Sequence, residues 1–207
     1  MNGLFILGTG ILAEEFFALA EHAGIPVASF VENLDRNKAD TSLCDRPIVW
    51  VDDVPRGARC VCALSTTKRI LFISQLEGRV EYVNLVHPSS IILPRTTLGE
   101  GTIVSCGVII ASNSLLGKHI FLNRGVRIGH HSRIGDFVTI QPGANIAGKT
   151  EIGDSTYIGM GAVIIERLRI GRESIIAAGA VVTKDVPDHV LVAGNPAVIK
   201  KENIDAK

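Results

Sequence analysis

The chain has 207 residues, enough for one large domain or two small ones. Apolar residues make up 46% and charged residues 20%, so the chain is globular rather than disordered. The 21 basic residues balance the 21 acidic ones and form no basic patch interleaved with aromatics, which argues against nucleic acid or an acidic membrane as a partner.

Residues 1–84 alternate short apolar runs with amphipathic stretches, a pattern that is typical of a small parallel βαβ sheet. The amphipathic stretches predict two helices, and Gly24 and Pro26 end the first of them. We expect helices at Ala13–Ala23 and Lys68–Leu76, and strands at Leu4–Leu7, Val27–Val31, Val61–Leu64 and Tyr82–Val86.

The four cysteines and the apolar runs indicate the cellular compartment in which the protein is expected. Cys60 and Cys62 lie in an apolar run and are expected to be buried strand thiols, while Cys44 and Cys106 do not complete a zinc site. The turn Gly8–Gly10 interrupts the first apolar stretch, which does not fit a signal peptide, and no run is long enough to span a bilayer. We therefore expect a cytoplasmic protein with reduced thiols and no transmembrane segment.

From Ile92 to Val182, every sixth residue is Ile, Leu or Val, without a gap. Neither a helix, with period 3.6, nor an ordinary strand, with period 2, requires a strict period of six. The residue after each aliphatic is usually small, so we interpret each hexad as a short strand and a tight corner, with the aliphatic pointing inward. Three hexads close one triangular coil, and about five coils stacked at roughly 4.8 Å predict a prism on the order of 24 Å tall.

This run resembles the hexapeptide repeat of the left-handed β-helix acyltransferases. The resemblance supplies the hand, because left-handed crossovers are otherwise disfavoured in parallel sheets. The segment Val192–Ala197 resembles the closing segment of that family beside coenzyme A. With the small domain in front, the chain resembles bacterial nucleotide-sugar N-acetyltransferases and sialic-acid O-acetyltransferase family proteins. We predict a nucleotide-sugar-binding α/β domain (1–84), a left-handed parallel β-helix (85–184) and a short C-terminal closing segment (185–207).

The phase of the repeat places His130 and His131 at a corner, pointing outward. A coil of three hexads predicts one column of corner residues in which a glycine leaves open space beside a histidine. That column contains Ser112, His130, Gly148 and Glu166.

The stretch from Leu122 to Val138 reads like the segment in which the family carries its catalytic histidine, so the resemblance implies His130 as the general base. A neutral imidazole, with a pKa of about 6.5, can take the proton of an attacking sugar amine or hydroxyl at pH 7. A positioned base is worth roughly 10²–10⁴ in rate. Because the chain has neither a nucleophile elbow nor a setting for a reactive cysteine, direct attack is favoured over an acyl-enzyme.

The sequence departs from the family at the residue after this histidine, which is commonly an acid that raises its basicity. His131 stands there instead; a neutral imidazole does not supply that charge, and a protonated one opposes it. Asp136 and Glu166 are the candidates to tune His130 in its place, within the chain or across a subunit boundary.

The resemblance implies acetyl-CoA as the acyl donor, with no metal. Thr139 matches a position where relatives carry a second histidine facing the acetyl group, and its hydroxyl can donate one hydrogen bond there. The positions matching the coenzyme A groove are Thr139, Gly148, Met160 and Ala178.

A second predicted site lies in the first domain. The loop Gly8–Ala13 reads G-x-G-x-x-A after a strand and before a helix, where backbone N–H groups suit phosphate. Glu32 fits the acid of a dinucleotide site, whereas the resemblance puts Glu32 and Asn33 near the base or ribose of a nucleotide-sugar. A structural βα turn is the alternative, and Asn123 is either near the acceptor sugar or a turn asparagine. The predicted set is Gly8, Gly10, Ile11, Leu12, Glu32, Asn33 and Asn123.

The leading hypothesis is acetyl transfer to an amino group of a nucleotide-linked, for example dideoxyamino, sugar in bacterial surface-glycan synthesis. The resemblance implies a homotrimer with its clefts between neighbouring prisms. Sugar O-acetylation and a non-catalytic nucleotide-sugar-binding protein remain alternatives. A carbonic anhydrase built on a prism is a further alternative, and it would need three histidines that converge on one metal ion. The candidates are His119, His130 and His131, but His119 is expected at the surface on a different corner from the other two.

Overall fold

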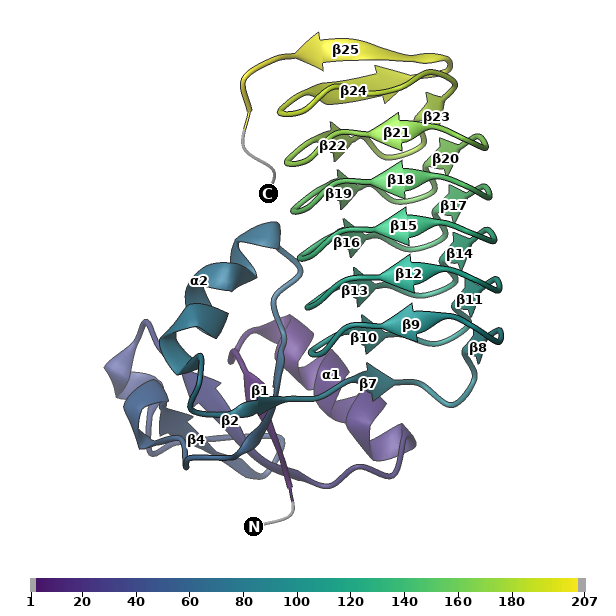
Figure 1. The fold of residues 1–207 in the computed structure, drawn as a ribbon. Coiled ribbons are helices and arrows are strands. Elements are labelled where there is room, and N and C mark those ends of the chain that lie inside the picture. Colours follow the sequence, from purple (N-terminus) through teal and green to yellow (C-terminus); the bar gives the residue numbers. More distant parts are fainter. Residues whose placement is uncertain (1–2, 205–207) are drawn as a thin grey trace.

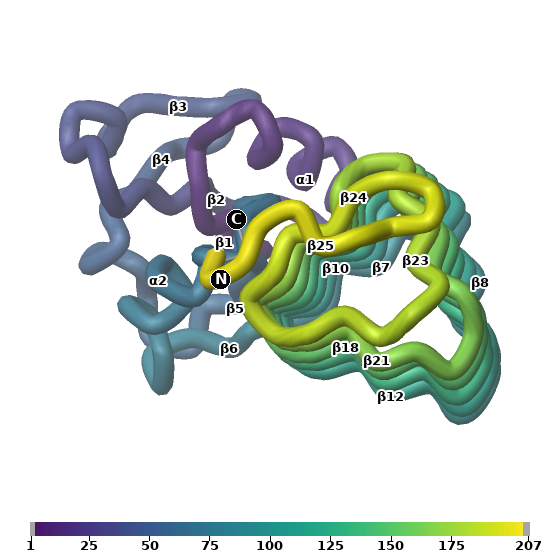
Figure 2. The backbone as a smooth tube through the Cα atoms, turned by 90° about the horizontal axis from the view of Figure 1, so that it is seen from above, coloured from purple at the N-terminus to yellow at the C-terminus, as the bar shows by residue number. Residues whose placement is uncertain are grey.

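The computed structural model describes residues 3–204, in which a small sheet domain lies beside the first coils of a three-sided left-handed β-helix (Figure 1). Seen along its axis, the β-helix has a triangular outline, with the small domain against one side (Figure 2). The predicted fold, an α/β domain followed by a left-handed prism, is confirmed. No helix in the range 3–204 is both long enough and apolar enough to cross a membrane.

The small domain is a six-stranded sheet in the order β3-β4-β2-β1-β5-β6. Its strands are β1 (Leu4–Leu7), β2 (Val27–Glu32), β3 (Ser42–Leu43), β4 (Arg46–Trp50), β5 (Arg59–Cys62) and β6 (Glu81–Tyr82). Strand β1 pairs in parallel with β2 and β5. Its alternate side chains point to opposite faces, so Leu4 and Ile6 pack under helix α1 (Ile11–His22), while Phe5 and Leu7 pack toward helix α2 (Ile70–Ile73).

Two predicted elements of this domain differ from the structure, and two strands were not predicted. The helix expected at Lys68–Leu76 is broken into α2 and two flanking 3₁₀ turns, Thr67–Arg69 and Ser74–Leu76. The strand expected at Tyr82–Val86 is two strands, because the Asn84 side chain accepts the Thr102 N–H at 2.9 Å and the chain then enters the prism. Strands β3 and β4 were not predicted. Two more 3₁₀ turns span Arg36–Lys38 and Val51–Asp53.

The prism has three faces of two-residue parallel strands. The first face contains β7 (Leu85–Val86), β10 (Ile103–Val104), β13 (Phe121–Leu122), β16 (Thr139–Ile140), β19 (Tyr157–Ile158) and β22 (Ile175–Ile176). The second face contains β8 (Ile91–Ile92), β11 (Ile109–Ile110), β14 (Arg127–Ile128), β17 (Asn145–Ile146), β20 (Val163–Ile164) and β23 (Val181–Val182). The third face contains β9 (Thr97–Leu98), β12 (Leu115–Leu116), β15 (Arg133–Ile134), β18 (Glu151–Ile152) and β21 (Arg169–Ile170).

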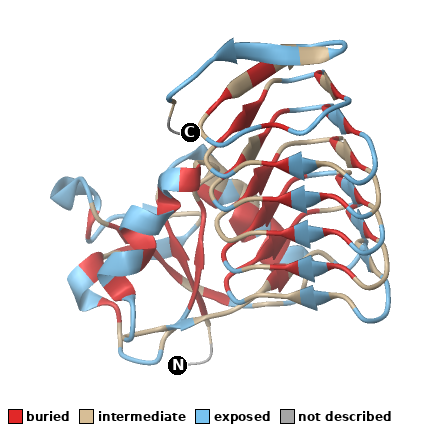
Figure 3. Ribbon diagram, turned by 45° about the horizontal axis from the view of Figure 1, so that its top comes forward, coloured by how far each residue is buried: buried red, intermediate tan, exposed pale blue. Residues whose placement is uncertain are grey.

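The aliphatic at every sixth position forms the core of the prism, as the sequence predicted. Each of these residues from Val104 to Val182 is at most 5% exposed, and they stack in one continuous cluster (Figure 3). Val104 pairs with Leu122 and Ile110 with Ile128, one coil apart. The top of the prism is covered by an antiparallel hairpin of β24 (Leu191–Gly194) and β25 (Ala197–Lys201).

The edge between the first and second faces uses glycine at five successive coils. The backbone there has positive φ, between 64° and 70°, a region in which side chains other than those of Gly, Asn and Asp are disfavoured. The glycines are Gly107, Gly125, Gly143, Gly161 and Gly179. Glycine is required at position 159 for a different reason, because a Cβ on Gly159 would lie 2.5 Å from the backbone nitrogen of Ala178 in the next coil.

These two kinds of glycine predict opposite responses to substitution. Gly159→Ala should destabilise the prism by about 1–3 kcal/mol or more, because neighbouring backbone cannot move aside without disturbing the stack. Gly161→Asn should change the free energy of unfolding much less, because Gly161 has open space around it and Asn tolerates positive φ. Urea denaturation of both variants measures the difference, and equal costs would contradict the clash at Gly159.

The small domain docks on the first face through apolar and polar contacts. The Phe16 ring of α1 packs edge-on against Phe121, with centroids 5.1 Å apart. Glu15, one residue before it, forms an ion pair with Arg124 at the first–second edge.

Arg69 forms a buried polar contact between the small domain and the prism. Its guanidinium is 2% exposed and donates hydrogen bonds to four oxygen atoms, two of them on prism carbonyls. The acceptors are the carbonyls of Thr66, His119 and Val138 and the hydroxyl of Thr139. Burial lowers the pKa of Arg69 to about 10, so it stays charged at neutral pH.

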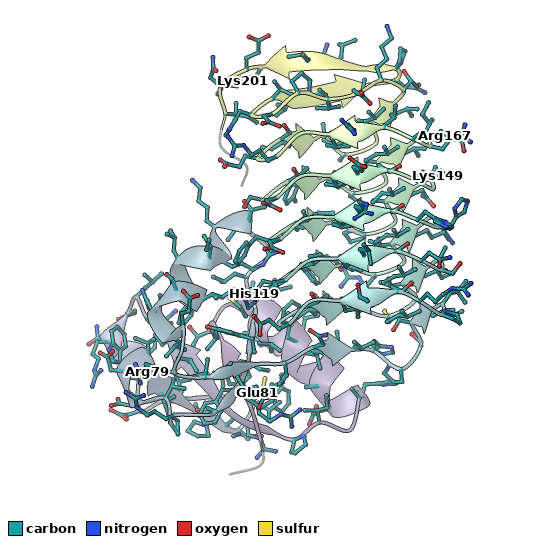
Figure 4. All side chains as sticks on the ribbon, in the orientation of Figure 1. Arg79, Glu81, His119, Lys149, Arg167 and Lys201 are labelled. Atoms are coloured by element: carbon teal, nitrogen blue, oxygen red, sulfur yellow. The ribbon has the colours of Figure 1, made fainter. Side chains whose placement is uncertain are left out.

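His119, expected at the surface, is buried at this interface, and the expectation was wrong (Figure 4). Its ring stacks on Phe137 at 5.2 Å and meets Tyr82 edge-on at 4.7 Å, so the docked domain covers a corner that the repeat leaves outward-facing. Its Nδ1 atom has no hydrogen-bond partner among the described residues. Burial is the main reason why the pKa of His119 is lowered from 6.5 to about 4.

This burial predicts an acid-sensitive interface. Since the folded pKa of His119 lies below its ordinary value, the unfolded chain binds more protons at acid pH. The stability contributed by the neutral ring is present above about pH 6.5 and is lost as pH falls toward about 4, by at most about 3 kcal/mol. The denaturation midpoint should therefore fall less between about pH 7 and about pH 4.5 in His119→Phe than in the wild type. Equal falls in both proteins would contradict this assignment.

Candidate active site

His130 lies exposed at the edge between the second and third faces, where the repeat predicted it. The predicted column is confirmed by backbone hydrogen bonds. The His131 N–H donates to Ser112, the Lys149 N–H to His130 and the Arg167 N–H to Gly148, so each coil repeats the same corner. A Cβ added at Gly148 would lie 3.0 Å from the His130 Nε2 atom. A side chain at Gly148 would therefore crowd that nitrogen.

An apolar groove adjoins this corner on the second face. It encloses about 490 Å³ and is open to solvent. Gly129, next to His130, contributes to its wall, together with Ile109, Val163, Ile165 and Glu166. A larger hollow of about 860 Å³ lies on the third face. Its wall is charged, with Arg133, Glu151 and Arg169. His130 lines neither hollow, but the smaller groove reaches Gly129, directly before it, so we associate the chemistry with the smaller groove.

The two adjacent histidines contact each other. The Nδ1 atoms of His130 and His131 lie 3.0 Å apart, with the rings nearly perpendicular at 88°. Such a contact needs one N–H donor and one lone pair, so the two rings are not free to choose their tautomers independently. His131 has a φ of 59°, as do the equivalent corner residues Asn113 and Lys149 within about two degrees.

The acids considered as tuners of His130 do not reach it within one chain, so this expectation needs correction. Asp136 lies at the third–first edge, where its carboxylate accepts the Lys118 N–H at 2.8 Å and supports the preceding coil. Glu166 shares the column of His130 but lies two coils away, about 10 Å at the spacing of parallel strands. It pairs with Arg167 instead.

Thr139 also needs correction. It was expected to face the acetyl group, but its side chain is completely buried under the small domain and accepts a hydrogen bond from Arg69 at 2.8 Å. It points outward from the first face, as the repeat requires, and the docked domain covers it. In this chain the Thr139 hydroxyl has no open path to a bound thioester.

The remaining prism residues lie on the opposite side of the second face from His130. Met160 and Ala178 are exposed in one column of the first–second edge, joined by the Gly179 N–H bond to Met160. Asn123 belongs to the same edge, next to Arg124. Its side chain is 7% exposed, donates to Gln141 and accepts the Arg124 N–H, which is the bonding of a turn asparagine. One chain therefore does not bring Met160 and Ala178 to His130.

The residues predicted in the first domain come together at the carboxyl edge of its sheet. The turn Gly8–Gly10 follows β1, and Glu32 ends the neighbouring β2. Gly10 precedes α1, whose first turn has no side-chain cap, so its N–H groups are available to a ligand. Ile11 and Leu34 are each 88% exposed beside this edge, and Leu12 is half-buried. Leu34 was not predicted from the sequence.

Glu32 has a structural role at this edge. One carboxylate oxygen accepts the N–H groups of Asn33, Leu34 and Asp35, and the other accepts the Thr9 hydroxyl. Burial alone would raise the pKa of Glu32, but these hydrogen bonds hold it below its usual value. Glu32 therefore shapes the loop through Oε1. Its Oε2 atom, which also lies 3.8 Å from the Lys38 ammonium, has a further lone pair, so a contact with a ribose hydroxyl stays a prediction. The Asn33 side chain donates to Gln75.

The three histidines of the carbonic anhydrase alternative do not converge. His119 is buried at the third–first edge, while His130 and His131 are exposed at the second–third edge. Across residues 3–204, no group of three or more His, Cys, Asp or Glu side chains could surround one metal ion. Within one chain, these residues therefore do not form the three-histidine site that this alternative requires.

Comparisons with known proteins identify the class. A family profile described as bacterial transferase hexapeptide (six repeats) matches residues 149–184. WeeI from Acinetobacter baumannii AYE is 30% identical over 95% of this chain and 99% of its own, with a TM-score of 0.85. The chain therefore belongs to the hexapeptide-repeat, left-handed β-helix acyltransferases and is an acyltransferase.

Two further solved structures are similar to this chain over nearly its whole length. A histidine-to-asparagine variant of perosamine N-acetyltransferase from Caulobacter crescentus, in complex with CoA and GDP-perosamine, is 28% identical over 98% of both chains, with a TM-score of 0.88. The acetyltransferase domain of PglB from Neisseria gonorrhoeae, in complex with acetyl coenzyme A, is 26% identical over 96% of this chain and 98% of that domain, with a TM-score of 0.85. A search of curated proteins gave no significant match.

Proposed function

We propose that this acyltransferase uses acetyl-CoA to acetylate an amino group of a nucleotide-linked amino sugar, with His130 as general base. The observation that carries the proposal is the His130 Nε2 atom beside the empty Cβ position of Gly148, next to the groove on the second face. The likeness to the Caulobacter and Neisseria acetyltransferases over nearly the whole chain supports the same class of donor and acceptor.

The proposed reaction is direct transfer. The acceptor nitrogen attacks the thioester carbon, a C–N bond forms, and His130 Nε2 takes the proton that the nitrogen loses. The C–S bond then breaks, and the proton on Nε2 goes to the departing sulfur, so His130 returns to its neutral state. The apolar wall of the groove suits the pantetheine arm, which has few charges to satisfy.

The nucleotide-sugar would lie with its diphosphate at the uncapped start of α1, where Gly10 leaves open space. The exposed Ile11 and Leu34 offer apolar surface beside it. Glu15 in the same helix is paired with Arg124, directly after Asn123. A ligand held at the loop could extend along α1 toward the first–second edge of the prism, which supports a role for Asn123 near the sugar.

The two edges of the second face support a homotrimer. His130 and Gly148 lie on one edge, and Asn123, Met160 and Ala178 lie on the other. We propose that a second copy places its first–second edge against the second–third edge of its neighbour, which would bring both sets to one coenzyme A. A mass measurement in solution by light scattering tests this: a monomer that turns over would contradict it.

The deciding experiment is acetyl-CoA turnover with a panel of nucleotide-linked sugars. Release of free CoA thiol and mass spectrometry of the product should report an acetylated amine with an amino-sugar acceptor. Turnover only with sugars that lack an amine would favour O-acetylation. Tight binding of CoA and nucleotide-sugars with no turnover across the panel would favour a non-catalytic binding protein.

A further inference from the structure

The structure assigns His131 as the residue that fixes the tautomer of His130, through a hydrogen bond from His130 Nδ1–H to the His131 Nδ1 lone pair. This inference rests on the proposed role of His130 as base. The two Nδ1 atoms are 3.0 Å apart, the distance of a normal N–H···N hydrogen bond.

The direction of that hydrogen bond follows from where the other nitrogen of His130 points. Nε2 lies 3.0 Å from the position that a Cβ of Gly148 would take, while Nδ1 is turned to His131. A neutral imidazole carries one proton, so a base at Nε2 requires that proton on Nδ1. His131 must then be the acceptor, which a neutral ring protonated at its own Nε2 provides.

The side chains around His131 come from the same edge of the prism. Ser112 and Gly148, the neighbours of His130 in its column, carry no charge. Lys149 occupies the position of His131 in the next coil, and Arg167 that of the coil after it. Both cations are labelled at this edge in Figure 4. Glu166, the acid of this edge, is paired with Arg167.

This arrangement gives His131 a function without a negative charge. When Nε2 takes the proton of the acceptor, His130 becomes an imidazolium and continues to donate Nδ1–H to His131. The lone pair of His131 stabilises that cation, and the hydrogen bond holds the ring in place throughout the cycle. His131 is thus a positioning residue that acts through His130 and does not touch the substrate.

The test compares His131→Phe, which removes the acceptor, with His131→Asn, which keeps an oxygen acceptor. Phenylalanine is compatible with the fold at such a corner, because Phe137 already occupies an equivalent one with a φ of 58°. We expect His131→Phe to lower kcat about 10- to 100-fold, the usual cost of losing a histidine's orienting partner, with KM for the nucleotide-sugar unchanged. His131→Asn should retain most of the turnover. Asn113→Phe, at the same corner one coil earlier, is the control for strain.

A second readout does not depend on turnover. Nitrogen-15 NMR of the histidine rings should show His130 protonated at Nδ1 and unprotonated at Nε2 in the wild type and in His131→Asn, with the proton shifted toward Nε2 in His131→Phe. A wild-type His130 protonated at Nε2, or the same tautomer in all three proteins, would overturn the inference. Wild-type protein with the expected tautomer but no acetyl transfer would instead contradict the proposed function alone.

Discussion

Replacing His130 with alanine should lower kcat for acetyl transfer by about 10²–10⁴-fold, the usual contribution of a positioned general base. The proton of the acceptor would then have to pass to water during the attack on the thioester. Because His130 is exposed at a corner, the change should alter the free energy of unfolding by no more than about 0.5 kcal/mol. Release of CoA thiol measures the rate, and calorimetry with CoA measures whether donor binding is retained.

Two further variants distinguish the loss of the general base from a disturbance of the structure. His130→Asn keeps a polar side chain of similar reach without a basic nitrogen and should be about as slow as His130→Ala. His22→Ala removes another exposed histidine, at the end of α1, and should turn over normally. Near-normal turnover of His130→Ala, with the protein folded and CoA bound, would remove His130 from the mechanism and leave the family assignment intact.

Replacing Arg69 with leucine should destabilise the protein by about 3–5 kcal/mol. The guanidinium is the only group that donates to the carbonyls of His119 and Val138 across the interface, among the hydrogen bonds of residues 3–204. Leucine would leave the His119 carbonyl buried without a donor and would remove one of the two donors of Val138, which still accepts the Phe121 N–H. Hydrogen bonds to a charged group are worth about 1.5–3 kcal/mol each. Urea denaturation should show the small domain unfolding before the prism, since the prism keeps its own core.

Controls for Arg69 lie beside it in the sequence and across the interface. Lys68→Leu changes an exposed neighbour and should cost little. Thr139→Val removes one of four acceptors and should cost about 1 kcal/mol. Arg69→Lys should still destabilise, because one ammonium cannot reach all four oxygens in the planar arrangement that a guanidinium serves. A single transition with the wild-type midpoint in Arg69→Leu would mean that the apolar contacts around Phe121 suffice for docking.

The prism was predictable because its signal is local and repeated. The period of six defines the inward positions from Val104 to Val182, and its phase correctly exposes His130 at a corner above Gly148. The sequence carries a second periodic signal, because a glycine recurs every eighteen residues from Gly107 to Gly179 and marks the first–second edge. Together with the period of six, this spacing distinguishes the three edges and puts Asp136 on a different edge from His130.

The small domain was less predictable where tertiary contacts override local pattern. The run from Lys68 to Leu76 has the composition of one helix, but Arg69 turns inward to reach the prism and the segment breaks into short turns. The apolar run from Tyr82 to Val86 looks like one strand, although its two ends belong to different sheets. In both segments the deciding contacts are with residues far away in the sequence.

The amino-acid sequence by itself determined the β-helix, its core and which side chains point outward, because each depends on residues no more than one coil apart. Only the tertiary structure decided what an outward side chain meets. His119 and Thr139 point away from the core, yet both are buried, since Arg69, 50 and 70 residues before them, docks there. The contact of His131 with His130 was likewise decided by ring orientations at one corner, which a periodic pattern does not encode.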